Sequence, residues 1–131
     1  MKKHQKRQVR EWIVPVLLSL ALFMILRFVI FVGIVPTDSM EPSIKQWSMV
    51  VGNRWYQELQ KDDVIVFCME DRYIVKRIAA VPGDIVCIDG VYMQVPECSY
   101  YVLGDNPKTS YDSRYFKDPF VKSKDIMAVI W

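Results

Sequence analysis

The sequence predicts a mainly β protein, with a compact, antiparallel, barrel-like domain behind one N-terminal transmembrane helix. Three observations indicate this fold. A long apolar run lies within the first third of the 131 residues, short runs rich in β-branched and aromatic residues follow it, and turn-forming residues separate those runs. Closely spaced strands with no convincing helix between them are typical of an all-β domain.

The apolar run extends from Trp12 to Pro36, and Arg27 is its only charged residue. About 20 apolar residues are enough to cross the hydrocarbon core of a bilayer. Arg27 lies near the outer end, where its long side chain can carry the charge to the interface. We therefore expect a basic tail at residues 1–11, an anchor at 12–33 and an extracytoplasmic domain at 34–131.

The end of the anchor leaves two alternatives open. The segment 28–35 is rich in β-branched and aromatic residues, so it either completes the helix or leads into a strand. Gly33 and Pro36 indicate that the helix has ended by about residue 33. No small-x-small site precedes Pro36, which favours an uncleaved anchor over a cleaved signal peptide.

The charges are distributed asymmetrically. Residues 1–27 hold six basic residues and one acidic residue, so 17 − 6 = 11 basic and 15 − 1 = 14 acidic residues remain in 28–131. Basic residues that flank a span stay on the cytoplasmic side. We therefore expect a single-pass protein of the cell membrane with its N-terminus in the cytoplasm and its domain on the outer face. No basic cluster in the domain suggests nucleic-acid binding.

The predicted strands are short apolar runs bounded by polar or turn residues. They are residues 47–51, 64–69, 73–80, 85–88, 91–95 and 100–103, with Val121 and residues 126–131 closing the sheet. Asp89-Gly90 between two of these runs predicts a hairpin with a type I′ turn.

The cysteines and the single histidine limit the chemistry of the domain. An external domain permits a disulfide, for which Cys87 and Cys98 are the better candidates because they flank the hairpin. The odd number of cysteines leaves one thiol over if that pair forms, and three small buried thiols are the alternative. The only histidine is His4 in the basic tail, which excludes a Ser-His-Asp triad in the domain and argues against a histidine-based zinc site. No metal or cofactor is expected.

Ser39 stands out because it lies between two prolines, Pro36 and Pro42, directly after the apolar run. Proline restricts its own backbone and biases the preceding residue toward an extended conformation. Ser39 is therefore expected on a stiff, non-helical turn that presents its hydroxyl. The alternative is a solvated, turn-forming serine with no role in chemistry.

A nucleophilic serine needs a base, and a lysine can serve only when its amine is neutral. Burial in apolar surroundings lowers the pKa of a lysine by up to several units. Lys76 lies within the apolar run 73–81, where strand alternation places it on one face with Ile74 and Ile78 and turns Arg77 outward. The alternative is a lysine on an edge strand that prevents strand pairing.

The segment 104–116 is the third candidate element, since it combines several hydroxyls with alternating charges. One interpretation is a solvated loop with an Asp112–Arg114 surface pair, which would contribute little. The other is a supporting shell in which a hydroxyl orients the lysine amine and a salt bridge holds the loop.

Together these three segments, in this order behind a basic-flanked span, resemble type I signal peptidases, the membrane-bound serine proteases that remove secretory signal peptides. Residues 36–42 resemble the nucleophile box of that family. Residues 73–77 with Pro82-Gly83-Asp84 resemble the general-base box, and residues 104–115 resemble the last box. The resemblance covers the chain from the anchor to near its C-terminus.

The resemblance implies a role for each matching residue. Ser39 would be the nucleophile and Lys76 the general base, and the oxyanion hole would consist of the Ser39 backbone N–H and the Thr37 hydroxyl. Ser110 would hydrogen-bond to the Lys76 amine. The remaining supporting residues would be Asp112 paired with Arg114, with Asp105 and Arg77 nearby. The shallow pockets for small substrate residues would be lined by Val35, Pro36, Met40, Ile44, Ile74 and Val75.

The resemblance further implies a mostly antiparallel β domain on the outer leaflet and secretory preproteins as substrates. Two features depart from the family. The segments between the boxes are compact, and Lys117 stands where the family commonly has glycine, which questions the local turn geometry. The rival hypothesis is a membrane-anchored, non-catalytic β domain that binds exported or envelope proteins, but the presence of both Ser39 and Lys76 argues against it.

Overall fold

The computed structural model describes the backbone of residues 2–131 and the side chains of residues 11–131. The side chains of the expected basic tail therefore lie outside the described residues, apart from Glu11. The chain divides into two compact units, residues 1–30 and residues 31–131.

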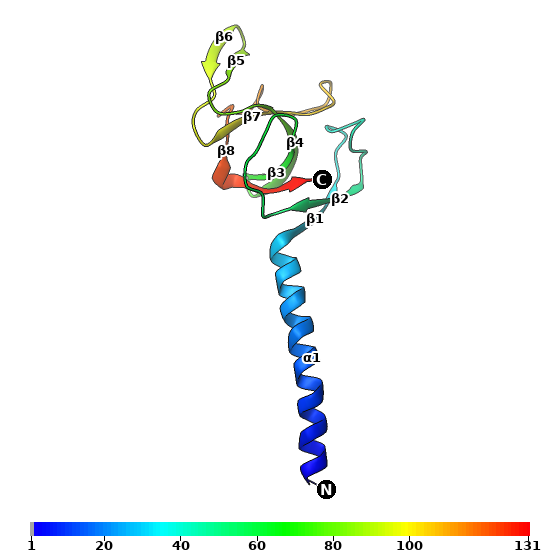
Figure 1. Cartoon of the computed structure of the whole chain (residues 1–131). Helices are drawn as coiled ribbons and strands as arrows, with labels where there is room; N and C mark the ends of the chain where they lie inside the picture. The colour runs from blue at the N-terminus through cyan, green and yellow to red at the C-terminus, as the bar shows by residue number, and fades with distance from the viewer. Residues whose placement is uncertain (1) are drawn as a thin grey trace. The chain divides into compact units, whose positions relative to one another are not determined.

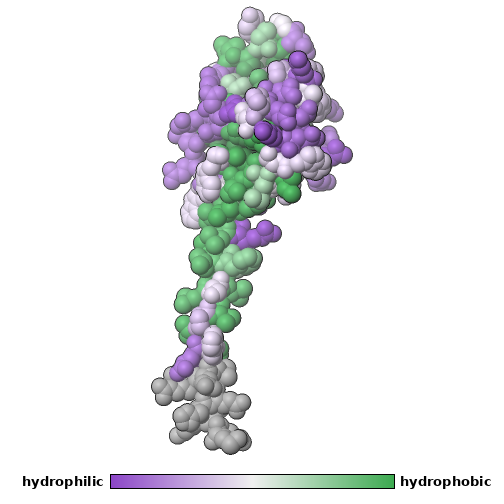
Figure 2. Space-filling view, turned by 90° about the vertical axis from the view of Figure 1, so that its right-hand side faces the viewer, coloured by the Kyte–Doolittle hydropathy of each residue, from purple (hydrophilic) through white to green (hydrophobic). Residues whose placement is uncertain are grey.

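The first unit is the helix α1 (Lys2–Val29), with Pro15 inside it. Its segment Glu11–Val29 has a mean hydropathy of 2.3. This segment is long and apolar enough to cross a membrane. Figure 2 shows hydrophobic residues over much of the part of this helix that is drawn in colour. The helix ends at Val29 and residues 30–35 form a strand, so the second alternative for the segment 28–35 is the one observed.

The second unit is built on antiparallel strands. These are β1 (Ile30–Val35), β2 (Ser48–Asn53), β3 (Val64–Met69), β4 (Arg72–Ala80), β7 (Ser99–Leu103), β8 (Val121–Lys122) and β9 (Ile126–Ile130) in one sheet, with the 3₁₀ turn η1 (Ser123–Asp125) before β9. A second sheet holds β5 (Ile85–Ile88) and β6 (Val91–Gln94). Figure 1 shows this hairpin projecting beyond the other strands.

The large sheet has the order β1-β2-β9-β3-β4-β7-β8. Each pair of neighbouring strands from β2 to β8 is antiparallel. The expectation of a mainly antiparallel β domain behind one apolar helix is confirmed. The barrel is not closed, because in the described residues β1 and β8 stand at opposite ends of the sheet.

The strand β3 lies at the centre of the domain and is buried on both faces. Ile65 and Phe67 face the main core, whereas Val66 packs on the other side with Phe31 and Ala128. This explains why β3 is a continuous apolar run rather than an alternating one. Residues 72–77 of β4 pair with the whole length of β3. This pairing places Lys76 opposite the fully buried Ile65.

Candidate active site

Ser39 and Lys76 are in direct contact. The Lys76 amine donates a hydrogen bond to the Ser39 hydroxyl, with 2.6 Å between Nζ and Oγ. The two residues are 37 positions apart in the sequence, and both are buried, with 4% of Lys76 and 5% of Ser39 exposed. The structure therefore brings together the serine that the sequence singled out and the lysine chosen as its base.

The position of Lys76 follows from strand alternation. Lys76 and Ile78 are both buried on one face of β4, while Arg77 between them is partly exposed. β4 pairs with β7 only from Arg77 onward, so one edge of β4 is open beside Lys76. The Lys76 side chain is nevertheless buried against Ser39, so the interpretation of it as an exposed lysine that prevents strand pairing is wrong. Burying the amine of a lysine inside a sheet costs free energy unless the amine makes a hydrogen bond to a specific partner.

Burial lowers the pKa of the Lys76 amine below its ordinary value. The nearby carboxylates of Asp112 and Asp105 act in the opposite direction, but their effect is smaller than that of burial. A lowered pKa increases the neutral fraction of the amine at a given pH, and only the neutral form can accept a proton.

The turn that carries Ser39 is fixed by backbone contacts. Within the turn, the Glu41 N–H donates to the Asp38 carbonyl and the Ile44 N–H donates to the Met40 carbonyl. The Thr37 hydroxyl lies 3.3 Å from the Ser39 hydroxyl. Thr37 is thus on the same side of the turn as the Ser39 hydroxyl, and its expected part in an oxyanion hole stays a prediction.

Asn106 holds the same turn from the segment 104–116. Its backbone N–H donates to the Ser39 carbonyl at 3.0 Å, and its side-chain amide donates to the Asp38 carbonyl at 3.3 Å. Sequence reasoning included Asn106 in a motif but gave it no role. Its place in the Gly-Asp-Asn run was the only available signal, because a contact with residues 67 positions earlier is not readable from local pattern.

Asp112 is the centre of the polar network beside the Ser39–Lys76 contact. Its carboxylate is fully buried and accepts hydrogen bonds from the Ser110 hydroxyl at 2.6 Å, the Gly104 N–H at 3.0 Å and the Arg114 guanidinium at 2.9 Å. Burial by itself would raise the pKa of Asp112, but these hydrogen bonds outweigh it and lower the pKa to about 2. The Asp112–Arg114 pair is therefore an anchor with a fully buried carboxylate and a partly exposed guanidinium, rather than a solvated surface pair.

Ser110 differs in part from the expectation. It is buried beside the dyad, but its hydroxyl donates to Asp112 rather than to the Lys76 amine. A hydroxyl that donates one hydrogen bond keeps two lone pairs for accepting others. The expected contact with Lys76 remains a proposal.

Gly104 is required by close packing. A Cβ atom at this position would overlap the Ser110 side chain and would lie 2.6 Å from the Ser39 carbonyl oxygen. Real Cβ atoms do not approach backbone oxygens so closely, so any larger residue would displace the loop or the nucleophile turn.

Arg77 and Asp105 form the second ion pair. The guanidinium donates to both carboxylate oxygens, at 2.8 and 2.6 Å, and also to the Asp62 carbonyl at 2.8 Å. A bidentate pair of this kind fixes direction as well as distance. It ties the outward face of β4 to the start of the loop that holds Asn106.

A cleft of about 400 Å³ opens beside the dyad. Four of the six expected pocket residues line it with Ser39 and Lys76, namely Val35, Pro36, Ile74 and Val75. Met40 is instead completely buried, and Ile44 lines a separate hollow with Pro42 and Ser43. The further lining residues that sequence reasoning missed are Phe31, Gly33, Ile34, Val50, Val66, Arg72, Tyr73, Thr109 and Tyr111.

The cysteines and Lys117 lie away from this chemistry. Cys68, Cys87 and Cys98 are free thiols in this structure, and the last two are exposed, so the interpretation as buried thiols is wrong for them. Lys117 is not among the described residues with a positive φ, so its backbone does not require the glycine that the family commonly has. In the described residues, no group of three or more His, Cys, Asp or Glu side chains is placed to hold a metal ion.

A serine hydroxyl in contact with a buried amine is an arrangement that hydrolases use in place of Ser-His-Asp. The comparisons with known proteins agree with this class. The family model described as signal peptidase, peptidase S26, matches residues 9–94 and 89–130. The chain therefore belongs to the signal peptidase family, which makes it a peptidase and supports the removal of signal peptides as its function.

The chain is also similar to individual proteins at lower sequence identity. The chain is 26% identical to signal peptidase I S of Bacillus subtilis (strain 168), over 92% of this chain and 86% of that protein. It is 24% identical to signal peptidase I of Bacillus amyloliquefaciens, over 94% of this chain and 86% of that protein. A crystal structure of a signal peptidase I from Enterococcus faecalis V583 aligns with a TM-score of 0.46 and 26% identity, covering 57% of this chain and 98% of that one.

Proposed function

We propose that this protein is a membrane-bound serine endopeptidase that removes N-terminal signal peptides from secreted preproteins with a Ser39–Lys76 dyad. The observation that carries the proposal is the contact of 2.6 Å between the Ser39 hydroxyl and the buried Lys76 amine. Family membership supports the substrate class, and the geometry supports the assignment of the two reacting groups.

In the proposed mechanism, the neutral Lys76 amine takes the proton of the Ser39 hydroxyl as the oxygen attacks the scissile carbonyl carbon. The carbonyl oxygen becomes an oxyanion, which the Ser39 N–H and the Thr37 hydroxyl stabilise. One such donor can contribute about 3 kcal/mol to transition-state binding. The Lys76 ammonium then protonates the leaving amine, and an acyl-enzyme remains on Ser39.

The second half of the reaction repeats these roles with water. Lys76 accepts a proton from the water that attacks the ester carbonyl, and it returns the proton to Ser39 as the acyl group leaves. Every proton transfer thus passes through groups of this chain, and the mechanism requires no metal or cofactor. Asp112 and Ser110 keep the surroundings of the amine fixed throughout the cycle.

The cleft supports an extended substrate. A peptide that lies beside residues 72–75 of β4 can pair with the backbone in the manner of an added strand. Val35, Ile74 and Val75 line the cleft with Ser39, where shallow pockets would favour small side chains at the cleavage site. We therefore propose cleavage after small-x-small sequences.

The apolar helix supports the proposed membrane location. The helical part of the expected anchor 12–33, which ends at Val29, would cross the membrane, because residues 30–35 form a strand of the domain. The basic residues 1–11 would lie in the cytoplasm and the catalytic domain, expected at 34–131, on the outer face. Anchoring would confine the enzyme to the surface where its preprotein substrates are held, which raises their effective concentration.

The test is cleavage of a preprotein with an Ala-x-Ala site by the intact chain in detergent, beside Ser39→Ala and Lys76→Ala. The parent should cut after the second alanine, and both variants should lose activity while staying folded. Lys108→Ala, which removes an exposed lysine of the segment 104–116, is the matched control and should cut normally. No cleavage by the folded parent would favour the non-catalytic binding domain, and activity that survives Lys76→Ala would refute the proposed base.

A further inference from the structure

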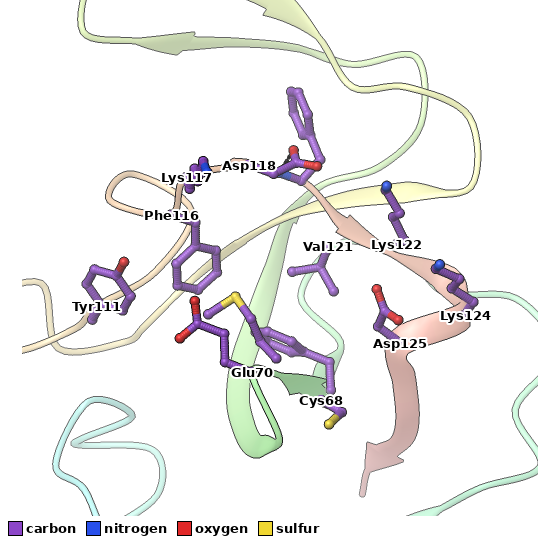
Figure 3. Close-up of a pocket in the computed structure, with 13 residues that line it drawn as sticks. Cys68, Glu70, Tyr111, Phe116, Lys117, Asp118, Val121, Lys122, Lys124 and Asp125 are labelled. Carbon is purple, nitrogen blue, oxygen red and sulfur yellow. Dashed lines mark hydrogen bonds between the residues drawn. The ribbon is translucent and has the colours of Figure 1, made fainter.

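A second hollow of about 250 Å³ lies next to the catalytic cleft. Figure 3 shows Tyr111 at one end of it and Lys122, Lys124 and Asp125 at the other, with Phe116 and Val121 between. The floor is apolar, because Phe67, Phe116 and Val121 belong to the main core. The rim carries charges of both signs and so has no strong preference for either.

Tyr111 is the residue that the two hollows share. It lines the catalytic cleft with Ser39 and Lys76, and it lines the second hollow with Phe116. Its side chain is 58% exposed although its two neighbours, Ser110 and Asp112, are buried and bonded to each other. Tyr111 is thus an exposed ring on a fixed backbone.

The ring of Tyr111 is itself supported by aromatic neighbours. It stacks on Tyr115 with 6.2 Å between centroids, and it meets the edge of Phe116 at 5.2 Å. Such pairs hold an exposed ring in a defined orientation. The boundary between the two hollows is therefore a preformed aromatic ridge.

The register of the β3–β4 hairpin explains why the hollows adjoin. Tyr73 and Arg72 line the catalytic cleft, and their partners Cys68 and Met69 line the second hollow. From Lys76 to Arg72 an extended chain covers about 13 Å, since a strand rises about 3.3 Å per residue. A peptide that runs from the dyad along β4 reaches the level of the second hollow after about four residues.

We infer that the second hollow is a substrate subsite for a bulky apolar side chain of the signal peptide, four to seven residues before the cleaved bond. This inference rests on the proposed function, in which small residues precede the cut and occupy the space beside Ile74 and Val75. In this arrangement the cut bond lies at Ser39 and the small residues lie beside Ile74 and Val75. The part of the peptide that extends further, toward Arg72, therefore comes before the small residues in the peptide sequence. The apolar side chain of this part of the peptide crosses the Tyr111 ridge and covers Phe116 and Met69.

The experiment uses the full chain in detergent and pairs of preproteins that differ at one position. Each pair has the same Ala-x-Ala site and carries Leu or Ser at one of the positions four to seven before the cut. The parent should show a KM about tenfold lower for Leu than for Ser at one of these positions, because burying a Leu side chain in an apolar site favours binding to that extent. The value of kcat should be the same for both.

Two variants locate the preference. Lys117→Trp places a bulky ring at the rim of the second hollow, and Tyr111→Ala removes the ridge, so each should abolish the difference in KM between Leu and Ser. Lys108→Trp changes a residue of the same segment that lines neither hollow, and it should keep the difference.

The outcomes separate the two proposals. No cleavage of any preprotein by the folded parent would refute the proposed function itself. Cleavage without a preference at positions four to seven, or a preference that survives both Lys117→Trp and Tyr111→Ala in folded protein, would overturn the subsite alone. A preference lost in both variants and kept in Lys108→Trp would establish it.

Discussion

The segment 104–116 and the β5–β6 hairpin differ in secondary structure and in burial, and in opposite directions. The hairpin has regular strands with four residue pairs, yet every residue of β6 is exposed. The segment 104–116, which the structure describes completely, contains no helix or strand, yet Ser110, Asp112 and Ser113 are buried in it.

The difference shows that polar contacts, and not regular secondary structure, hold the segment 104–116 of the candidate site, whereas Lys76 is held by the strand β4. Asp112 accepts hydrogen bonds from three residues, and the Ser113 hydroxyl accepts one from the Val102 N–H at 2.9 Å. Buried polar groups stabilise only when all partners are present, because an unpaired one keeps its full desolvation cost. Substitutions should therefore have large effects in this segment and small ones in the hairpin.

The largest effect is expected for Asp112→Asn. The amide keeps the size of the carboxylate, but it removes the charge that Arg114 faces and directs an NH₂ group at a donor. Loss of one partner of a buried ion pair costs about 3 kcal/mol, and misplacement of the dyad should lower the cleavage rate at least ~100-fold. Thermal unfolding and a cleavage assay measure the two effects.

The matched substitution near the hairpin is Asp84→Asn. Asp84 pairs with Lys61 at 3.0 Å, but the Lys61 side chain is 55% exposed, so water can replace the contact. Activity should be unchanged and the loss of stability much smaller than for Asp112→Asn. Equal losses in the two variants would contradict the contrast between the regions.

The next effect in size compares two glycines. Gly104→Ala forces a methyl group against Ser110 and the Ser39 carbonyl, so we expect the cleavage rate to fall by about 100-fold. Gly90→Ala in the hairpin meets open space, and its φ of +83° costs only about 1 kcal/mol of local strain. The account predicts normal kcat/KM for Gly90→Ala, and a normal value for Gly104→Ala would count against it.

A smaller effect concerns stability in acid. The folded pKa of Asp112 is about 2, below its ordinary value of 3.8, so its ionised form stabilises the fold above pH 4. That contribution is lost as the pH falls from about 4 toward 2, because the unfolded chain takes up the proton first. Unfolding curves over this range should show a steeper loss for the parent than for Asp112→Asn, and parallel curves would refute the assignment.

The smallest effect is expected at the hairpin surface. Tyr92 is 78% exposed on β6, so Tyr92→Ser should change the free energy of unfolding by no more than about 0.5 kcal/mol. The cleavage rate should stay at the parent value. A tenfold loss of activity in folded Tyr92→Ser would mean that the hairpin takes part in substrate binding.

Local pattern was sufficient to predict most of the strands and the position of Lys76, although it left β1 open between helix and strand. The hairpin with its Asp89-Gly90 turn appears where the sequence placed it, with positive φ at both turn residues. Alternation along β4 placed Lys76 inside and Arg77 outside. These features depend on neighbours in the sequence, and for that reason the sequence alone predicts them.

Features that depend on distant contacts were not predictable in the same way. Met40 is buried because the turn folds back on itself, and Tyr111 reaches the cleft from a segment 72 positions after Ser39. The open order of the sheet depends on β9 inserting between β2 and β3, which no local signal specifies. The exposure of Cys87 and Cys98 likewise follows from the projecting hairpin and its flank.

The measurement that tests the central claim most directly is the pH dependence of kcat/KM for cleavage at an Ala-x-Ala site. Burial lowers the pKa of Lys76, and the base must be neutral, so the rate should fall about tenfold per pH unit once the pH drops below that pKa. Unfolding followed under the same conditions shows that the protein remains intact. A falling acid limb is the result that the account predicts, and a rate that stays flat down to pH 5 would contradict Lys76 as the base.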